Sequence, residues 1–277
     1  MAFTILWGLG FLAHFLPAAA AQTTQLDRFV GRDFWAVVAS ENELPDLLEL
    51  AGKVPKGFVV APEPWRFWKA TGVGQAQYIF LLGESLVLIP GGSSVCVQTF
   101  DGSAKRINSW SFQTGWRIAL TGASIQYSNE IASDLIAIHT VPIVNGLNIA
   151  KEYFAIGGNR LRLIRLENDK GEPVQNEYAL PNYEIGVVPE AHTVEEWAGL
   201  LESKDKADVL SALVFLGGRH IDVGPWPSES KYAGLWRQLT GSRRIRESIE
   251  LLSRSGSDWI RQAAVSAARG PHPRLFE

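Results

Sequence analysis

The segment from Asp134 to Val174 has the sequence DLIAIHTVPIVNGLNIAKEYFAIGGNRLRLIRLENDKGEPV, and it predicts three consecutive strands. Asn145-Gly146 separates the first two apolar runs, since both residues accept the positive φ that a two-residue hairpin turn requires. Gly157-Gly158-Asn159 offers the same freedom before the third run, and Asp169-Lys170-Gly171 supplies a turn after it. We therefore expect an antiparallel meander here.

Further β signals precede this segment. Short β-branched or aromatic runs alternate with glycine-rich punctuation such as Asp101-Gly102-Ser103 and Thr121-Gly122, a pattern typical of antiparallel strands. The predicted strands are 78–82, 86–89, 95–100, 106–112 and 116–120. With the three later strands they make about eight. A sandwich or an open barrel is the expected arrangement, and a propeller-like array is the alternative.

The remaining chain has a different character on each side of this β region. Residues 34–38 and 57–61 are short strand candidates, and 43–52 has the composition of a helix with Pro45 in its first turn. Beyond Pro189 the pattern is helical. Thr193 and Glu196 have the spacing of a capping box at a helix start.

The expected fold class is therefore α+β and multidomain, with a β meander followed by a short α-solenoid-like domain. We expect four units: 1–21 as a signal peptide, 22–71 as a small mixed α/β segment, 72–190 as the β-rich domain and 191–277 as the helical domain.

The first 21 residues carry no charged side chain. The run from Ile5 to Leu16 is almost wholly apolar, and Ala18 to Ala21 offers a small-residue cleavage site, which predicts a secretory signal cleaved after Ala21. The Lys or Arg that usually precedes such a run is absent, so an uncleaved anchor is the alternative. No later segment is apolar for long enough to span a membrane. The expected location is secreted or periplasmic.

Composition narrows the partners. The chain has 277 residues, 46% of them hydrophobic and 20% charged, which is ordinary for a folded protein. Its net charge of -3 argues against nucleic acid. The charge is unevenly distributed along the chain. Lys231 to Glu277 contains nine Lys or Arg and four Asp or Glu, so the rest of the chain contains 17 Lys or Arg and 25 Asp or Glu. The C-terminal segment is therefore basic and the remainder acidic.

Cofactor and metal motifs are missing. Cys96 is the only cysteine, which excludes an intramolecular disulfide and every zinc site that needs two or more cysteines. The five histidines, among them His139 in an apolar strand, are widely spaced. No phosphate-binding or dinucleotide-binding loop is present. We therefore predict neither a cofactor nor a metal.

Two groups of residues keep other functions open. A glycosidase needs only two suitably placed carboxylates, and four lie near predicted strand ends: Glu130, Asp134, Glu152 and Glu167. Trp65 and Trp68 could stack against a sugar ring, although aromatic residues more often anchor a subdomain in a core. An extracytoplasmic hydrolase or a glycan-binding module is thus the alternative function, and no single residue is predicted to be catalytic.

An internal repeat occurs in the last third of the chain. Residues 200–213 contain Leu200-Leu201, a polar turn ending at Asp205 and then an Ala-rich run, and residues 251–265 repeat this order. An offset of 51 residues superposes Leu201 on Leu252 and Ala212 on Ala263. The small alanines allow two helices to approach closely, and the aliphatic residues fill the space between them.

This pattern, covering about residues 194–269, resembles a HEAT-type helical repeat. The period is longer than that of the family, which an insertion at residues 219–229 would explain, and only the second unit has the typical arginine, at Arg261. Two units are also fewer than the three usually needed for a stable solenoid, so the helices are expected to pack on the β unit for support, or else the likeness is to a plain helical bundle.

The resemblance implies a non-catalytic scaffold that binds another protein through its helices. The candidate binding residues there are Arg243, Arg244, Arg246, Trp259 and Arg261. A basic face for an acidic partner would consist of Arg237, Arg243, Arg244, Arg246 and Arg254. A structural subunit of an envelope assembly is a further possibility.

Overall fold

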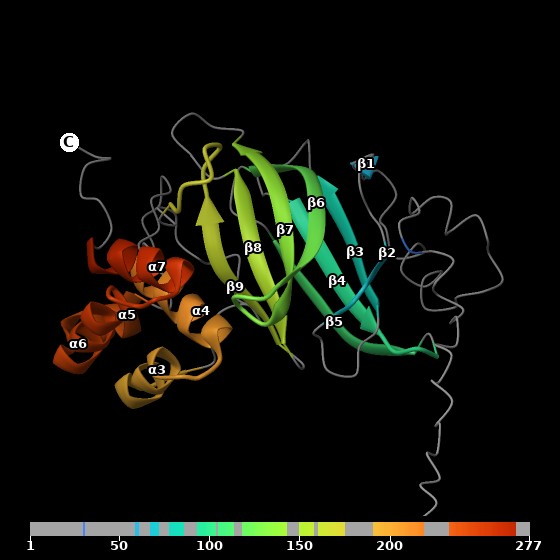
Figure 1. Ribbon diagram of the computed structural model, residues 1–277. Helices are drawn as coiled ribbons and strands as arrows, with labels where there is room; N and C mark the ends of the chain where they lie inside the picture. The colour runs from blue at the N-terminus through green and yellow to red at the C-terminus, as the bar shows by residue number, and fades with distance from the viewer. Residues whose placement is uncertain are drawn as a thin grey trace, which may run out of the picture.

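The computed structural model describes residues 30, 59–60, 67–71, 78–85, 93–103, 105–113, 118–142, 150–157, 160–174, 191–218 and 233–269. Within these ranges two antiparallel sheets are followed by five helices, which is an α+β architecture. Figure 1 shows the helices gathered on the side of the molecule where β9 lies, with β1 and β2 on the opposite side.

The first sheet contains β1 (Val59–Val60), β2 (Phe67–Lys69), β3 (Tyr78–Ser85), β4 (Ser93–Phe100) and β5 (Arg106–Gln113). β4 pairs with β3 and β5, while β1 and β2 pair with opposite ends of β3. The strands predicted at 78–82, 95–100 and 106–112 are confirmed. The strands predicted at 34–38 and 86–89 and the helix at 43–52 lie outside the described residues.

The second sheet runs in chain order through β6 (Ile118–Ser128), β7 (Ser133–Pro142), β8 (Lys151–Gly157) and β9 (Arg160–Glu167). The meander expected after Asp134 is confirmed. The expected end of a strand before Thr121-Gly122 is wrong, because β6 continues to Ser128. Its register with β7 shifts between Leu120 and Gly122, so the glycine marks a β-bulge inside the strand.

A second bulge determines which way the charged residues of β9 point. The register between β8 and β9 shifts where Phe154 pairs with Leu163 and Tyr153 with Arg165, leaving Ile164 as the additional residue. In a regular strand Arg162 and Arg165 would point to opposite faces. The bulge returns Arg165 to the face of Arg162 and so collects the charged residues of β9 on one side.

The helices are α3 (Val194–Leu201), α4 (Lys206–Gly217), α5 (Ala233–Gly241), α6 (Arg243–Leu252) and α7 (Asp258–Arg269). The predicted capping box is confirmed: the Thr193 hydroxyl accepts from the amide of Glu196, whose carboxylate accepts from the amides of Thr193 and His192. These bonds satisfy amides that the first helical turn leaves without partners.

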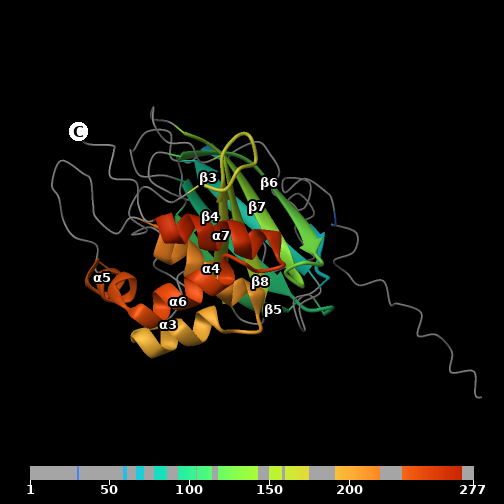
Figure 2. The same cartoon turned by 60° about the vertical axis from the view of Figure 1, so that its left-hand side comes forward.

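The helices form two pairs of neighbours, α3 with α4 and α6 with α7, and the pairs contact each other in equivalent ways. α3 packs on α6, and α4 packs on α7. α4 also packs on β9 and is buried along nearly its whole length. In Figure 2, α4 and α7 lie in front of the sheets, with α3, α5 and α6 farther out.

One hydrophobic core runs through strands and helices together. It extends from Tyr78 and Phe100 in the first sheet through Phe154 in the second to Leu213 and Ala264 in the helices. At Gly217, α4 and α7 approach so closely that a β-carbon added to this glycine would lie 3.4 Å from the backbone of Ala267. None of the described helices is both long and apolar enough to cross a membrane.

Candidate functional site

Charged and aromatic residues are concentrated where the helices meet β9. We call this group the β9 junction: Arg160, Arg162, Arg165 and Glu167 from β9, Tyr153 from β8, Asp205 and Asp208 at the start of α4, and Trp259 and Gln262 from α7. Because the bulge turns the charged side chains of β9 toward the helices, the junction joins segments far apart in the sequence.

Arg162 is the centre of the first half of the junction. Its side chain is only 6% exposed, and its Nη1 donates to Asp205 Oδ2 at 2.7 Å and to Asp208 Oδ1 at 2.6 Å. Arg160 adds a longer contact of 3.2 Å to Asp208. The Arg162 Nε, by contrast, is buried and has no hydrogen-bond partner among the described residues. An unsatisfied buried donor costs about 1–3 kcal/mol, so the network is not fully compensated.

Asp205 has two functions at this point. Its side chain accepts from the amide of Ala207 at 2.9 Å and thereby caps the N-terminus of α4. Burial raises the pKa of its carboxyl group, but the hydrogen bond and the charge of Arg162 outweigh that effect and lower the pKa below its ordinary value. Asp205 therefore stays ionised at neutral pH and holds β9 to the helix start.

Arg165 is the centre of the second half. Its Nε donates to Glu167 Oε1 at 2.5 Å and its Nη1 to Gln262 Oε1 at 2.9 Å. The guanidinium lies 4.8 Å from the centre of the Trp259 ring, a cation–π distance. Tyr153 meets the same ring edge-on at 5.4 Å and donates its hydroxyl hydrogen to Glu167 Oε2 at 3.0 Å. Trp259 thus packs against two strands from its place in α7.

The Tyr153 hydroxyl is a hydrogen-bond donor and not a nucleophile. Burial is the largest cause that raises its pKa to about 12, followed by the negative charge of Glu167 and the hydrogen bond to it. The phenol is therefore neutral across the physiological range. It serves to satisfy the second oxygen of a carboxylate that Arg165 already binds.

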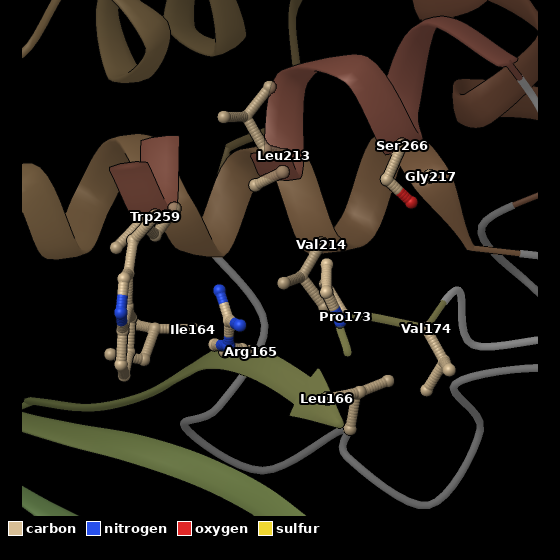
Figure 3. A pocket seen from close by; sticks show the side chains of 12 residues that line it. Ile164, Arg165, Leu166, Pro173, Val174, Leu213, Val214, Gly217, Trp259 and Ser266 are labelled. Atoms are coloured by element: carbon tan, nitrogen blue, oxygen red, sulfur yellow. The ribbon is translucent and has the colours of Figure 1, made fainter. Parts of the chain in front are cut away.

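A small cavity of about 30 Å³ lies beside this second half. Figure 3 shows Arg165 pointing up from β9 between Trp259 on one side and Val214 on the other, with Leu213 above them. A water molecule needs about 10–15 Å³ measured in this way, so the cavity has room for about two water molecules. Its lining is largely aliphatic. It is too small for a metabolite, and we interpret it as a packing gap between the sheet and the helices.

Three of the four carboxylates considered for hydrolysis bind groups that the structure identifies. Glu167 binds Arg165 and Tyr153, as described above. Asp134 is buried and accepts twice from the amide of Thr71, at 2.9 and 3.1 Å, which ties the end of β2 to β7. Glu130 accepts from the Ser257 hydroxyl at 2.5 Å and from the amide of Trp259 at 3.4 Å, at the start of α7. Glu152 is fully buried in β8.

Histidine and cysteine play no visible part at the junction. Burial is the main cause that lowers the pKa of His139, with a smaller contribution from Lys151, so this imidazole is neutral at pH 7. Cys96 belongs to β4. Within the described ranges, no group of three or more His, Cys, Asp or Glu residues is placed to hold a metal ion.

The predicted aromatic binding residues are separated in the structure. Trp65 lies outside the described residues. Trp68 is in β2, opposite Ile79 of β3, and its half-buried side chain packs against the core. Trp259 lies in the β9 junction. For Trp68 and Trp259 this placement favours the anchoring role over a sugar platform.

The predicted arginines lie on the second helix pair. Arg243, Arg244 and Arg246 are exposed on α6. Arg243 binds Glu247 at 2.7 Å, and Arg244 reaches Glu202 beside α3 at 3.1 Å. Arg261 in α7 pairs with Asp258 and donates to the carbonyl oxygen of Ser255 at 3.2 Å, bracing the turn between the two helices. These pairs compensate part of the positive charge.

Sequence reasoning did not identify the β9 junction. The sequence did contain an indication of it. Residues 160–167 read RLRLIRLE, and arginines in a strand that packs against a buried helix need carboxylates nearby to compensate their charge. Asp205 and Asp208 in the repeat supply them. The bulge that brings Arg165 to the same face leaves no equally clear mark in the sequence. Comparison of the chain with protein-family models, with curated proteins and with solved structures found no match.

We predict that replacing Arg162 alone lowers the free energy of unfolding strongly, whereas replacing Arg162 and Asp208 together changes it little. Arg162→Met leaves Asp208 buried with only two longer contacts, to Arg160 at 3.2 Å and to the Ser203 hydroxyl at 3.3 Å. It should lower the free energy of unfolding by about 3 kcal/mol. The double variant Arg162→Met/Asp208→Leu should lie within about 1 kcal/mol of the wild type, because an apolar pair can replace a buried ion pair. Urea denaturation measures both. A double variant that is destabilised as much as Arg162→Met, or more, would contradict the prediction.

A second prediction concerns the pH dependence at Asp205. Asp205→Asn keeps a good helix N-cap but removes the charge that Arg162 binds, so it should cost about 0.5–1 kcal/mol at pH 7, discounted because the side chain is 42% exposed. Since the folded-state pKa is lowered, this stabilisation exists above the unfolded-state pKa and is lost as the pH falls through the folded-state pKa. Urea titrations at several pH values below neutrality should show the two proteins converging under acid conditions. A difference independent of pH would show that the charge is not the cause.

Proposed function

We propose that this chain is a non-catalytic, secreted or periplasmic protein that binds another protein through its HEAT-like helices. The observation that carries the proposal is the equivalent stacking of the two helix pairs, α3 on α6 and α4 on α7. That is the way in which consecutive units of a helical repeat pack. The helix pairs begin and end close to the positions that the 51-residue offset relates.

The different positions of the helices support a binding role: α4 and α7 are the inner helices, next to the sheets, and α3 and α6 are the outer ones. α4 packs on β9, and α7 contributes Trp259 and Gln262 to the junction with that strand. α3 and α6 form what we call the outer helix row, joined by the ion pair from Arg244 to Glu202. The inner helices fix the unit to the sheets. α5 contacts both α3 and α6, and these two helices still present exposed side chains such as Glu195 and Glu250.

This arrangement also explains how only two repeat units can form a stable helical region. An isolated pair of repeats buries too little apolar surface to be stable. Here the β unit takes the place of a further repeat, because the hydrophobic core continues from the sheets into the helices. The β unit, proposed to be a sandwich or an open barrel, thereby supports a short solenoid-like end. The engaged carboxylates described above favour this reading over a hydrolase.

Site-specific photo-cross-linking tests the proposal on the whole chain. A photoreactive amino acid would replace Glu195 in α3 or Glu250 in α6, and in the matched controls Lys105 or Ser124 on the β unit; all four are exposed. We expect the mature protein in the extracytoplasmic fraction to begin at Gln22 and to cross-link a protein from the two helical positions only. Cross-links from the β positions alone, or none from any position, would contradict it.

A further inference from the structure

The turn between β6 and β7, residues 129–132, lies between two hydrogen-bonded contacts to distant parts of the chain. Glu130 in the turn accepts from the hydroxyl of Ser257, immediately before α7, at 2.5 Å. Asp134, the second residue of β7, accepts from the amide of Thr71, two residues beyond β2, at 2.9 and 3.1 Å. One short turn therefore joins the end of a strand in the first sheet to the start of the last helix.

The backbone of this turn is held in a fixed shape. Ala132 has a φ of 57°, in the left-handed region where a β-carbon is unfavourable. A residue keeps such a conformation only where the surrounding structure enforces it. Here the Ile131 side chain is 4% exposed in the core, and the Ser133 hydroxyl donates to the carbonyl oxygen of Ile156 in β8 at 2.6 Å. The two carboxylate residues, each two positions from Ala132, thus belong to one constrained segment.

The contact with Ser257 fixes the first turn of α7. The Ser257 hydroxyl accepts from the amide of Ile260 at 3.4 Å while it donates to Glu130, so it caps the helix and binds the β6–β7 turn at the same time. Glu130 also accepts from the amide of Trp259 at 3.4 Å. The ring of Trp259 lies 4.8 Å from the Arg165 guanidinium. The turn therefore holds the end of α7 from which the helix reaches the β9 junction.

We propose that the β6–β7 turn is a built-in conformational coupling, through which the start of α7 and the backbone at Thr71 tighten and loosen together. The helix side of the coupling is the contact between Glu130 and Ser257, and the sheet side is the contact between Asp134 and Thr71. The coupling concerns contacts within the chain, so it does not depend on the proposed function. Its consequence for that function is that a partner that displaces α7 also changes the contact at the end of β2.

Native-state hydrogen exchange of the full chain, followed by NMR, measures both sides of this coupling. The amide of Thr71 reports on the contact with Asp134. The amide of Arg261, which donates to the carbonyl oxygen of Ser257 at 2.9 Å, reports on the first turn of α7. Each rate is compared with that of the Leu213 amide in the buried helix α4, which reports on global unfolding.

Glu130→Ala removes the acceptor at α7, and we expect the Thr71 amide then to exchange about fivefold faster or more relative to the Leu213 amide. Glu130→Gln keeps an oxygen that accepts a hydrogen bond but loses the charge, so its rate should lie between those of Glu130→Ala and the wild type. In the reverse direction, Asp134→Asn should accelerate exchange at Arg261, because coupling between two sites is reciprocal.

The matched control is Thr193→Ala, which removes a helix N-cap of the same kind from α3. It should leave the ratio of the Thr71 rate to the Leu213 rate unchanged. An unchanged ratio in Glu130→Ala overturns the inference, because the turn then does not transmit the change. An equal rise of the ratio in Thr193→Ala overturns it as well, because the acceleration would then follow from the loss of any helix cap.

Discussion

The ion pairs between Arg162 and the two aspartates that begin α4 are the constraint on which the arrangement of sheets and helices depends. A guanidinium group that is 6% exposed cannot remain between a sheet and a helix without anions, since removing its charge from water costs several kcal/mol. Asp205 and Asp208 supply those anions, the first as the N-cap and the second in the first turn of α4, the helix that packs on β9. The position of α4 along the strand is therefore set by charge pairing, while the stability of the contact comes mainly from the apolar residues around it.

Local backbone geometry makes this pairing possible. The bulge at Ile164 brings Arg165 to the same face as Arg162, so one strand presents both ends of the junction to the helices. Gly157 has a related role, because a β-carbon at that position would overlap the Arg162 guanidinium. A residue that looked like a turn former in the sequence thus also leaves room for a buried charge. The Arg165 end adds directional contacts to Trp259 and Gln262, which fix α7 as well.

The parts of this structure that follow from short-range patterns could be predicted, and the parts that depend on long-range pairing could not. Alternating apolar runs gave β7, β8 and β9, and the Thr193–Glu196 spacing gave the start of α3. The same rules failed at Gly122, where a glycine permits a bulge as readily as a turn. Glu130, Asp134 and Glu167 were recognised as candidates for chemistry, yet their partners Ser257, Thr71 and Arg165 depend on tertiary contacts or on the bulge. Sequence spacing carries no information on such contacts.

If the β9 junction fixes the helices to the sheets, the two parts should open together. Native-state hydrogen exchange in increasing denaturant measures this directly, by comparing the opening free energies of amides in β9 with those of amides in the middle of α4 and α7. The account predicts that these values merge into one global unfolding event in the wild type. An opening of α4 and α7 several kcal/mol below that of β9 would show that the helices detach as a separate unit, and it would contradict the claim that the junction and the shared core hold the molecule together.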